Sequence, residues 1–570
     1  MFDLSGLADV ILLLALVLLF APVLGAYLAR VYTDRPVLGD AFWRPIERVI
    51  YRLLGVDPRH SMRLREYAVA LVLTIAALVA WIWAILFFQS SLPWNPLQLP
   101  GFGWDLAFHS AASFATNTDF THFTNESQLS LGAAVLGLQI ALFFSAASGL
   151  AVVAAFIRGF TSRDGTLGNF YVDMVRSVTR FLLPAAFVGA LFLLLMNVPQ
   201  TFTSYVTAHG FAGSSQTIYL GPVASWSSIE LIGTNGGGWY AANAGAALAN
   251  PSALTSLVET GMMLLVPFSV PFMFGRMVRR PAESYPYIAT ILIVLLIALG
   301  LYIYFQASGN PALGGIAFLD PGTNGYPVGQ ASQYSVGEAS LFQVASVYAN
   351  VGAANAALGS LTSGAQMVLF FGMFTQSTPG GVGTGFGGLL VFALVGVFIA
   401  GLMVGRTPEY LGKKVGKDQM RWSAAALILH PALILVPVLL AVAGGWAAAA
   451  GVGPLGSNVA VNAHQFTILL YEFTSEAANN GSAMGPINDT SLFFNVAGGI
   501  VMLLGRLIPM IAMLSIGSLF AQQEYVPEST GTLKTNSATF TIYLALIVIV
   551  VSGLLFLPVL ALGPLAQGGW

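Results

Sequence analysis

The stretch VASWSSIELIGTNGGGWY, residues 223–240, decides how this chain folds. Its first part, residues 223–232, is too short to cross a bilayer, which takes roughly 20 apolar residues, and it is too apolar for an open loop. It predicts a short re-entrant helix. Residues 233–236, Gly-Thr-Asn-Gly, must then be extended backbone at membrane depth. Such backbone is tolerated only where it lines a water- or ion-filled cavity.

The same design occurs four times along the chain: a short semi-polar run, a motif of Thr, Asn and Gly, then a new apolar span. The runs are DLAFHSAASFA (105–115), VASWSSIELI (223–232), EASLFQVASVY (338–348) and AHQFTILLYEF (463–473). The motifs are Thr116-Asn117-Thr118-Asp119, Gly233-Thr234-Asn235-Gly236, Ala349-Asn350-Val351-Gly352 and Ala478-Asn479-Asn480-Gly481. Their third residues are 117, 116 and 129 positions apart. A period this long predicts a repeated multi-helix unit.

The composition places these units in a membrane. The 570 residues are 56% apolar and 8% charged, without Cys, whereas soluble domains are about 25% charged. A soluble enzyme, a nucleic-acid binder, a disulfide scaffold and a disordered chain are therefore excluded or disfavoured. We expect ten spans, near residues 7–29, 67–88, 129–157, 177–198, 252–275, 284–306, 365–404, 424–447, 491–521 and 538–562. The seventh is long and broken by glycine.

The predicted fold is an all-α polytopic membrane protein with four fused span–pore loop–span repeats and two extra helices. Each repeat takes two spans, so the repeats use spans two to nine. The predicted boundaries are 1–65 for the first span and its loop, 66–160, 161–278, 279–421 and 422–523 for repeats 1 to 4, and 524–570 for the last span.

The 22 Lys and Arg residues orient the spans. They fall in five clusters, of which the largest holds eight residues between Arg30 and Arg65, and the segments 66–157, 181–275, 281–405 and 422–505 contain none. The positive-inside rule places the clusters in the cytoplasm and both termini outside. The outer segments keep acids without cationic partners, and an acidic mouth attracts cations. These acids are Asp105, Asp119, Glu126, Glu230, Asp320, Glu338, Glu472, Glu476 and Asp489.

Four re-entrant loops around one axis would make a ring of backbone carbonyls, and such rings replace the hydration shell of a cation. Asn and Gly suit these loops because they accept unusual backbone angles at low cost. Each motif alone is typical of an ordinary turn. Four copies at near-equal spacing favour the pore-loop interpretation.

Several motifs carry a resemblance to the KdpA family, the potassium-binding subunits of ATP-driven Kdp potassium pumps, and the likeness extends over almost the whole chain. They are SAASGLAVVAAFIRGF (145–160), TLGNFYVD (166–173), GTNGGGWYAAN (233–243), GGVGTGFGG (380–388), GLMVGRTPEYLGKK (401–414) and NNGSA (479–483). The resemblance implies a K⁺-selective filter that passes the ion to a P-type ATPase subunit. It also implies a KdpC-like accessory subunit, a small single-span subunit, and a prokaryotic inner membrane. The implied filter residues are Thr116, Asn117, Thr118, Asp119, Gly233, Thr234, Asn235, Gly236, Asn243, Asn350, Val351, Gly352, Asn479, Asn480 and Gly481.

Three positions depart from the family pattern. The first loop usually continues Asn-Trp-Gln, but here it reads Asp119-Phe120-Thr121. The third loop usually reads Ser-Thr-Gly, and Val351 offers a carbonyl but no hydroxyl. A Gly-Glu pair usually precedes GGVG, where this chain has Thr375-Gln376. These changes bear on ion affinity more than on ion identity.

Two features below the predicted filter concern the ion path. The resemblance implies that the glycine run of the seventh stretch is a flexible intramembrane loop, a gate, whose residues include Gly380, Gly381, Gly383 and Gly385; close packing of small residues is the alternative. Arg506 interrupts an apolar run, where a charge is costly and usually faces a cavity. It would stop a cation from passing straight through, unless it merely reaches the inner membrane surface.

Other signals are weak. The six His residues, 60, 109, 122, 209, 430 and 464, show no metal-ligand spacing, so no transition-metal site is expected. No nucleotide-binding or phosphorylation motif occurs, so we expect no nucleotide on this chain, no ATP hydrolysis by it, and energy from a partner. A self-sufficient potassium channel or symporter is the alternative. An intramembrane transferase using Asp105 and His109 would need a clustered acid–base site, which the sequence does not reveal.

Overall fold

The structure is a computed structural model that describes residues 4–209, 214–307, 334–405, 407–452, 459–525 and 533–568. Arg406 and Asp320, two of the charged residues considered above, lie outside these ranges. Within them, ten helical segments are long and apolar enough to span a membrane, which confirms the predicted number. They are α1 (Leu4–Tyr32), α3 (Leu64–Phe87), α6–α7 (Leu131–Thr161), α8–α9 (Phe170–Leu195), α11 (Ala253–Met277), α12 (Ser284–Ala307), α16 (Thr384–Val404), α17 (Lys417–Ala443), α20 (Leu492–Ala521) and α21 (Ala538–Leu562).

The seventh apolar stretch, predicted as one long span broken by glycine, is divided into two helices. It forms a short helix, α15 (Ser363–Thr375), and the span α16, with a glycine-rich connection at 376–383. Gln376 ends α15 in the left-handed region at φ 48°, and Gly380 and Gly383 also have positive φ. A right-handed helix cannot continue through these conformations, so the helix breaks between α15 and α16.

All four predicted re-entrant runs are helices. They are α4 (Trp104–Ala115), α10 (Val223–Ile232), α14 (Val336–Tyr348) and α19 (Val459–Ala478). The fourth is longer than predicted. Each lies between two spans in chain order, which gives the span–short helix–span pattern four times.

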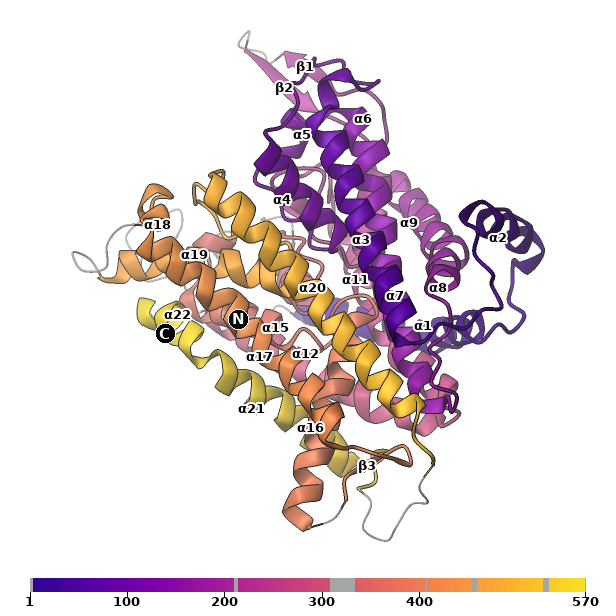
Figure 1. The fold of residues 1–570 in the computed structure, drawn as a ribbon. Coiled ribbons are helices and arrows are strands. Elements are labelled where there is room, and N and C mark those ends of the chain that lie inside the picture. Colours follow the sequence, from indigo (N-terminus) through magenta and orange to yellow (C-terminus); the bar gives the residue numbers. More distant parts are fainter. Residues whose placement is uncertain are drawn as a thin grey trace.

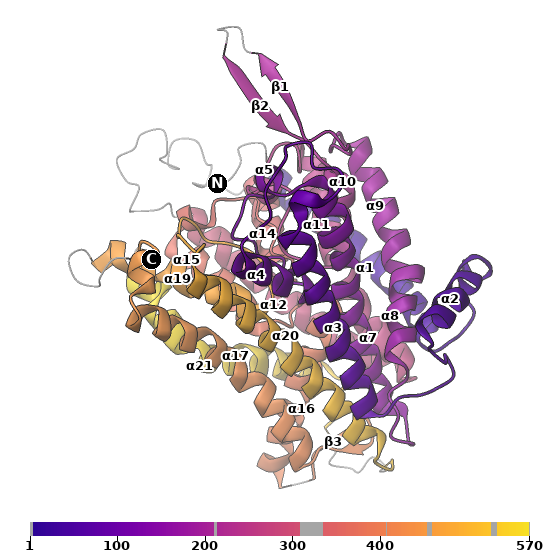
Figure 2. The ribbon, with the colours of Figure 1, turned by 45° about the horizontal axis from the view of Figure 1, so that its top comes forward.

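The remaining elements are short. The hairpin of β1 (Tyr205–His209) and β2 (Ser215–Tyr219) projects beyond the helices (Figure 2). The hairpin of β3 (Glu409–Tyr410) and β4 (Lys413–Lys414) lies at the opposite end. The amphipathic helix α2 (Asp40–Leu54) lies beside α8 (Figure 1). The other helices are α5 (Asn125–Gln128), α18 (Trp446–Ala449), α22 (Pro564–Gln567), η1 (Gln89–Ser91), η4 (Asn243–Gly245), η5 (Pro281–Glu283) and η7 (Leu358–Ser360).

The bundle is built around α7. Of its most apolar window, 83% is buried inside the protein, against 28% for α1 and 22% for α17. Small residues such as Gly149 and Gly159 let neighbouring backbones approach α7 closely, as is usual between membrane helices. The peripheral helices keep apolar side chains outward, where lipid tails would contact them.

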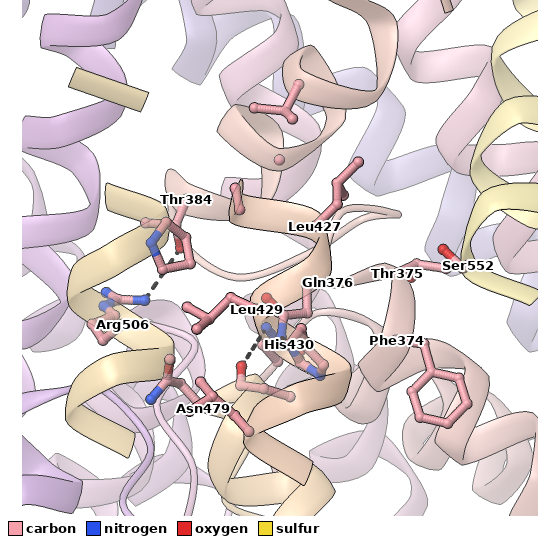
Figure 3. A pocket seen from close by; sticks show the side chains of 18 of the residues that line it. Phe374, Thr375, Gln376, Thr384, Leu427, Leu429, His430, Asn479, Arg506 and Ser552 are labelled. Atoms are coloured by element: carbon pink, nitrogen blue, oxygen red, sulfur yellow. Dashed lines mark hydrogen bonds between the residues drawn. The ribbon is translucent and has the colours of Figure 1, made fainter. Parts of the chain in front are cut away.

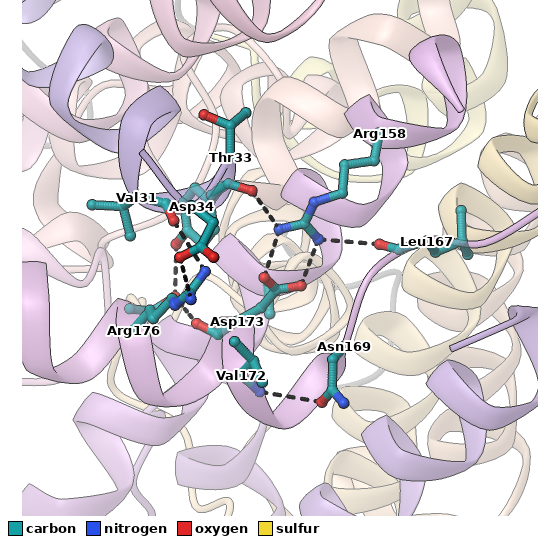
Figure 4. Close-up of polar contacts among 12 residues, drawn as sticks. Val31, Thr33, Asp34, Arg158, Leu167, Asn169, Val172, Asp173 and Arg176 are labelled. Carbon is teal, nitrogen blue, oxygen red and sulfur yellow. Dashed lines mark hydrogen bonds and ion pairs between the residues drawn. The ribbon is translucent and has the colours of Figure 1, made fainter. Parts of the chain in front are cut away.

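The end of the bundle that carries the basic clusters is held by ion pairs (Figure 4). Arg158 of α7 forms two hydrogen bonds of 2.6 Å with the buried carboxylate of Asp173, which also accepts from the Tyr67 hydroxyl at 3.0 Å. Lys413 donates to three backbone carbonyls at the ends of α7 and α20. Burial, with Arg163 nearby, lowers the pKa of Lys413 to about 8, so it remains charged at neutral pH.

Both chain ends lie at the end of the bundle where the short helices begin. Gly6 packs against Ser335, the N-cap residue of α14. At the other terminus, the Ser363 hydroxyl at the start of α15 donates to the Gly568 carbonyl at 2.7 Å. Ten spans require such same-side termini.

Candidate functional site

The four loops after the short helices share one backbone conformation. One residue just beyond each short helix has a positive φ of 46–66°: Asn117, Thr234, Asn350 and Asn479. In each loop the next residue donates its backbone N–H to the carbonyl five positions earlier. These bonds are Thr118 to Ser113 at 3.0 Å, Asn235 to Glu230 at 2.8 Å, Val351 to Ser346 at 2.8 Å and Asn480 to Ser475 at 2.9 Å. The repeat predicted from sequence spacing therefore extends to individual hydrogen bonds.

The loops converge on one another. A Cβ added to Gly236 would lie 2.0 Å from the Thr118 carbonyl oxygen and 2.4 Å from that of Asn480. Equivalent Cβ atoms on Gly481 and Gly352 would lie 2.0 Å from Thr118 and 2.1 Å from Asn480, again at carbonyl oxygens. Only glycine permits backbones this close. The carbonyls of different loops therefore gather at one place.

Side-chain amides tie neighbouring loops together. Three of these hydrogen bonds run from Asn117 Nδ2 to the Thr234 carbonyl at 2.6 Å, from Asn350 Nδ2 to the Ala478 carbonyl at 3.1 Å and from Asn479 Nδ2 to Thr118 Oγ1 at 2.9 Å. Thr116 Oγ1 and Thr118 Oγ1 share a further bond of 2.8 Å. Hydrogen bonds between residues of the loops therefore hold the four loops together.

The third residues of the motifs turn their side chains into the surrounding protein. Asn235 donates to the Leu142 carbonyl at 3.2 Å, and Asn480 donates to the Val347 carbonyl at 3.1 Å. Val351 packs in an apolar cluster that contains Phe342. At these positions the backbone carbonyls, and not the side chains, are therefore available to an ion. The absence of a hydroxyl on Val351 removes no group that would contact an ion.

Buried acceptor oxygens at the loops lack a donor. Among the described residues, Asn117 Oδ1, Asn350 Oδ1 and both carboxylate oxygens of Asp119 are buried without a hydrogen-bond partner. Such groups are costly unless something compensates them, and a cation is what acceptor oxygens alone can bind. Asn243 is half-buried against the backbone of Gly238, two residues after Gly236.

The glycine-rich connection lies directly against the second and third loops. Val382 donates its backbone N–H to Thr234 Oγ1 at 2.7 Å, and Gly380 donates to the Tyr348 carbonyl at 2.8 Å. A Cβ on Gly381 would lie 3.3 Å from Asn350. The glycine-rich connection therefore lies next to the loops, as the sequence predicted.

Arg506 lies next to the same connection. It is 6% exposed, and its guanidinium donates to Thr384 Oγ1 at 3.2 Å and to the Ser145 carbonyl at 3.3 Å. It forms no ion pair within the described residues. An added Cβ on Gly383 would lie 2.5 Å from the Gly149 carbonyl, and one on Gly385 would lie 2.5 Å from Gly380 Cα, so these glycines permit close packing around the arginine.

A cavity of about 80 Å³ opens beside Arg506 (Figure 3). It reaches the loops at Asn350 and Asn479 and extends to Gln376, His430 and residues of α21. Gln376, where the family pattern has Glu, donates to His430 of α17. Spacing arguments missed this contact because the two residues are 54 positions apart.

A second cluster also escaped prediction. His109 and His122 stack with ring centroids 3.7 Å apart and contact Glu476 and Glu472. Spacing could not reveal it because the contacting pairs are 350 and 367 residues apart. The only local signal in the sequence was the spacing of Glu472 and Glu476, which are four residues apart and so lie on one face of a helix.

Four short helices that aim convergent, carbonyl-rich loops at one axis define a class of membrane protein: fused four-repeat transport proteins with a channel-like fold. TrkH, the potassium transporter from Vibrio parahaemolyticus, shares this fold with a TM-score of 0.51 at 15% identity, over 86% of this chain and 97% of that one. The chain belongs to the KdpA family, described as the potassium-transporting ATPase A subunit, which it matches over residues 11–568.

Curated relatives cover nearly the whole chain. Proteins from Nostoc sp. and Alicyclobacillus acidocaldarius are 37% and 38% identical over 99% of this chain and 98% and 99% of their own. One from Pseudomonas aeruginosa is 38% identical over 97% of each. All three are named potassium-transporting ATPase potassium-binding subunit.

Proposed function

We propose that this chain is the potassium-binding and translocating subunit of an ATP-driven uptake complex. It takes K⁺ from outside through the four-loop ring and passes it to a P-type ATPase subunit. The observation that carries the proposal is the convergence of the loops, in which glycines of three loops contact carbonyl oxygens of their neighbours. The names of the relatives supply the ion and the kind of complex.

A ring of carbonyls suits K⁺ because carbonyl oxygens replace its hydration shell without requiring side-chain charge. The selectivity filter is proposed to comprise the four motifs, Thr116–Asp119, Gly233–Gly236, Asn350–Gly352 and Asn479–Gly481. The unpartnered oxygens of Asp119 and Asn117 support a cation there. Asn243, which lies against the backbone of Gly238 just after the second motif, remains part of the proposed filter.

The cavity beside Arg506 is the proposed route out of the filter. A cation leaving the loops would meet the buried guanidinium, and like charges repel strongly where the dielectric constant is low. The ion therefore turns aside into the cavity toward Gln376 and His430. The glycine-rich connection, 376–383, is the proposed gate, because it contacts the second and third loops at Thr234 and Asn350 and its first residue, Gln376, lines this cavity.

The proposed topology follows from the charges and the same-side termini. Repeats at 66–160, 161–278, 279–421 and 422–523 surround the axis, with spans 1–65 and 524–570 outside it. Both termini lie outside a prokaryotic inner membrane. The proposed partners are a P-type ATPase catalytic subunit, a KdpC-like subunit and a small single-span subunit.

The test is to purify the chain with its neighbours and measure ATP hydrolysis as K⁺ is added. We expect an ATPase subunit to copurify and its activity to rise with K⁺. If no such subunit copurifies and K⁺ does not stimulate hydrolysis, the pump assignment fails. The stand-alone channel or symporter predicts a different result, rapid K⁺ flux into liposomes that contain this chain alone.

A further inference from the structure

Two histidines and three carboxylates form a cluster outside the filter, which we call the histidine–carboxylate cluster. Its members are His109 of α4, His122 after the first loop, Glu472 and Glu476 of α19, and Asp489 before α20. His109 Nε2 lies 3.1 Å from Glu476 Oε1. His122 Nε2 lies 3.0 Å from Glu472 Oε1 and 3.9 Å from Asp489 Oδ2. The cluster joins repeat 1 to repeat 4.

The hydrogen bonds around His122 determine which of its ring nitrogens carries a proton. Asn495 Nδ2 donates to the Asp105 carboxylate at 2.9 Å, which orients the amide. Its Oδ1 then faces His122 Nδ1 at 2.7 Å. A carbonyl oxygen only accepts, so Nδ1 carries the hydrogen. The other nitrogen of a neutral ring, Nε2, therefore directs a lone pair at Glu472 and Asp489.

A lone pair facing two carboxylates is repulsive unless a cation, either a metal ion or a proton, lies between them. Metal-binding histidines are typically arranged this way, with one ring N–H donated to an oxygen and the other nitrogen free for the metal. The Asp105–Asn495 pair is such a support.

The three carboxylates of the cluster are not neutralised by any Lys or Arg of the segments that form it. The segments that contribute to it, within 66–157 and 422–505, contain no Lys or Arg. Glu476 is 1% exposed, and its Oε2 has no hydrogen-bond partner, nor has the buried His109 Nδ1. Gly498 of α20 leaves the space that the Glu476 carboxylate fills, since a Cβ there would lie 1.9 Å from Oε1. The pocket for this carboxylate is therefore built into the packing.

We propose that the histidine–carboxylate cluster binds one divalent transition-metal ion of the Zn²⁺ class. His122 Nε2, Glu472 and Asp489 are the first ligands, and His109 or Glu476 completes the coordination. The ligand atoms of each triad, His122–Glu472–Asp489 and His109–His122–Glu476, lie within 4.8 Å of one another. Four ligands at about 2.0–2.2 Å from Zn²⁺ lie roughly 3.4 Å apart, so small rotations close the site.

The donor set selects the metal. Imidazole nitrogen with carboxylate oxygen suits Zn²⁺ and similar ions, whereas K⁺, Mg²⁺ and Ca²⁺ favour oxygen alone. The Asp489 side chain is 19% exposed and offers an entry route, while the other four members are buried. A bound ion would fasten α4 to α19, and so the first filter loop to the fourth. This site is separate from the filter and departs from the absence of a transition-metal site expected from histidine spacing.

The test uses the purified full chain, stripped with a chelator and titrated with Co²⁺ and then Zn²⁺ at constant K⁺. We expect one Co²⁺ per chain with visible absorption bands, displaced by Zn²⁺. H122Q and E472Q should weaken Zn²⁺ binding by more than about 100-fold, beyond the usual effect of outer-shell changes. The control H60Q/H209Q removes two exposed histidines and should bind as wild type does.

Thermal unfolding gives a second readout that does not depend on transport. Zn²⁺ should raise the melting temperature of wild type and H60Q/H209Q but not of E472Q, whose amide keeps the shape of the glutamate. Wild-type chain that binds no ion at this stoichiometry overturns the proposal, and a proton on His122 is then the compensating cation. E472Q that binds as tightly as wild type overturns it as well.

Discussion

Gly236→Ala is the sharpest probe of the four-loop ring. The added methyl would lie 2.0 Å from the Thr118 carbonyl oxygen and 2.4 Å from that of Asn480. Carbon and oxygen contact at about 3.3 Å, so both carbonyls must move by roughly 1 Å. Gly236 has no positive φ, so this displacement is the whole of the expected effect.

The magnitude follows from electrostatics. With a carbonyl partial charge of about −0.5 and an effective dielectric constant of about 20, moving one oxygen from about 3 to about 4 Å from a monovalent cation costs about 0.7 kcal/mol. Two carbonyls give about 1.4 kcal/mol, which corresponds to about tenfold in affinity. We therefore expect the half-saturating K⁺ concentration to rise about tenfold.

The assay is the K⁺ dependence of ATP hydrolysis by the purified complex, with melting temperature as a check on folding. Gly300→Ala in α12 is the matched control, because a Cβ there meets nothing within 4 Å. It should leave the half-saturating concentration unchanged. Equal K⁺ dependence of G236A and wild type, in a folded complex, would refute the assignment of these carbonyls to the ion.

Two further predictions concern the basic end of the bundle. D173N breaks the buried ion pair with Arg158 and should lower the free energy of unfolding by about 3–5 kcal/mol, measured as a lower unfolding midpoint. The control D418N lies in an exposed pair 3.7 Å long and should lower it by less than about 0.5 kcal/mol. Equal shifts of the two midpoints would contradict the reasoning. K413M leaves three backbone carbonyls without their donor and should destabilise the protein by about 3 kcal/mol. The control K414M replaces the exposed neighbouring lysine and should change stability by less than about 0.5 kcal/mol. A small effect of K413M would show that water satisfies those carbonyls.

Sequence reasoning reached the fold because its strongest signals are local. Span length, the ten-residue run 223–232 and the absence of Lys and Arg from the outer segments each report on one segment. In the stretch 365–404 the glycine run signalled the break, but not that the break divides the stretch into the short helix α15 and the span α16. The exact end of α15 at Gln376 depends on a left-handed conformation that a residue other than glycine rarely adopts, so the sequence did not place it.

For the four-loop site, the sequence predicted the positions of the residues better than their individual roles. The motif positions were identified because they repeat, but their roles differ in ways that spacing does not encode. Asn235 and Asn480 have the same side chain as Asn117, yet they donate into the surrounding protein while Asn117 links two loops. Asn243 was named from the family resemblance, and the structure places it against the backbone of Gly238, just after the second motif.

The sequence by itself determined the membrane class, the number of spans and the period of the repeat, because hydrophobicity and charge act over a few turns of one helix. Only the tertiary structure decided which carbonyls converge and that Arg506 faces the glycine-rich connection. It alone brought His122 within 3.0 Å of Glu472. Contacts between residues 350 positions apart depend on the packing of α4 and α19 against α20, and no local pattern records that packing.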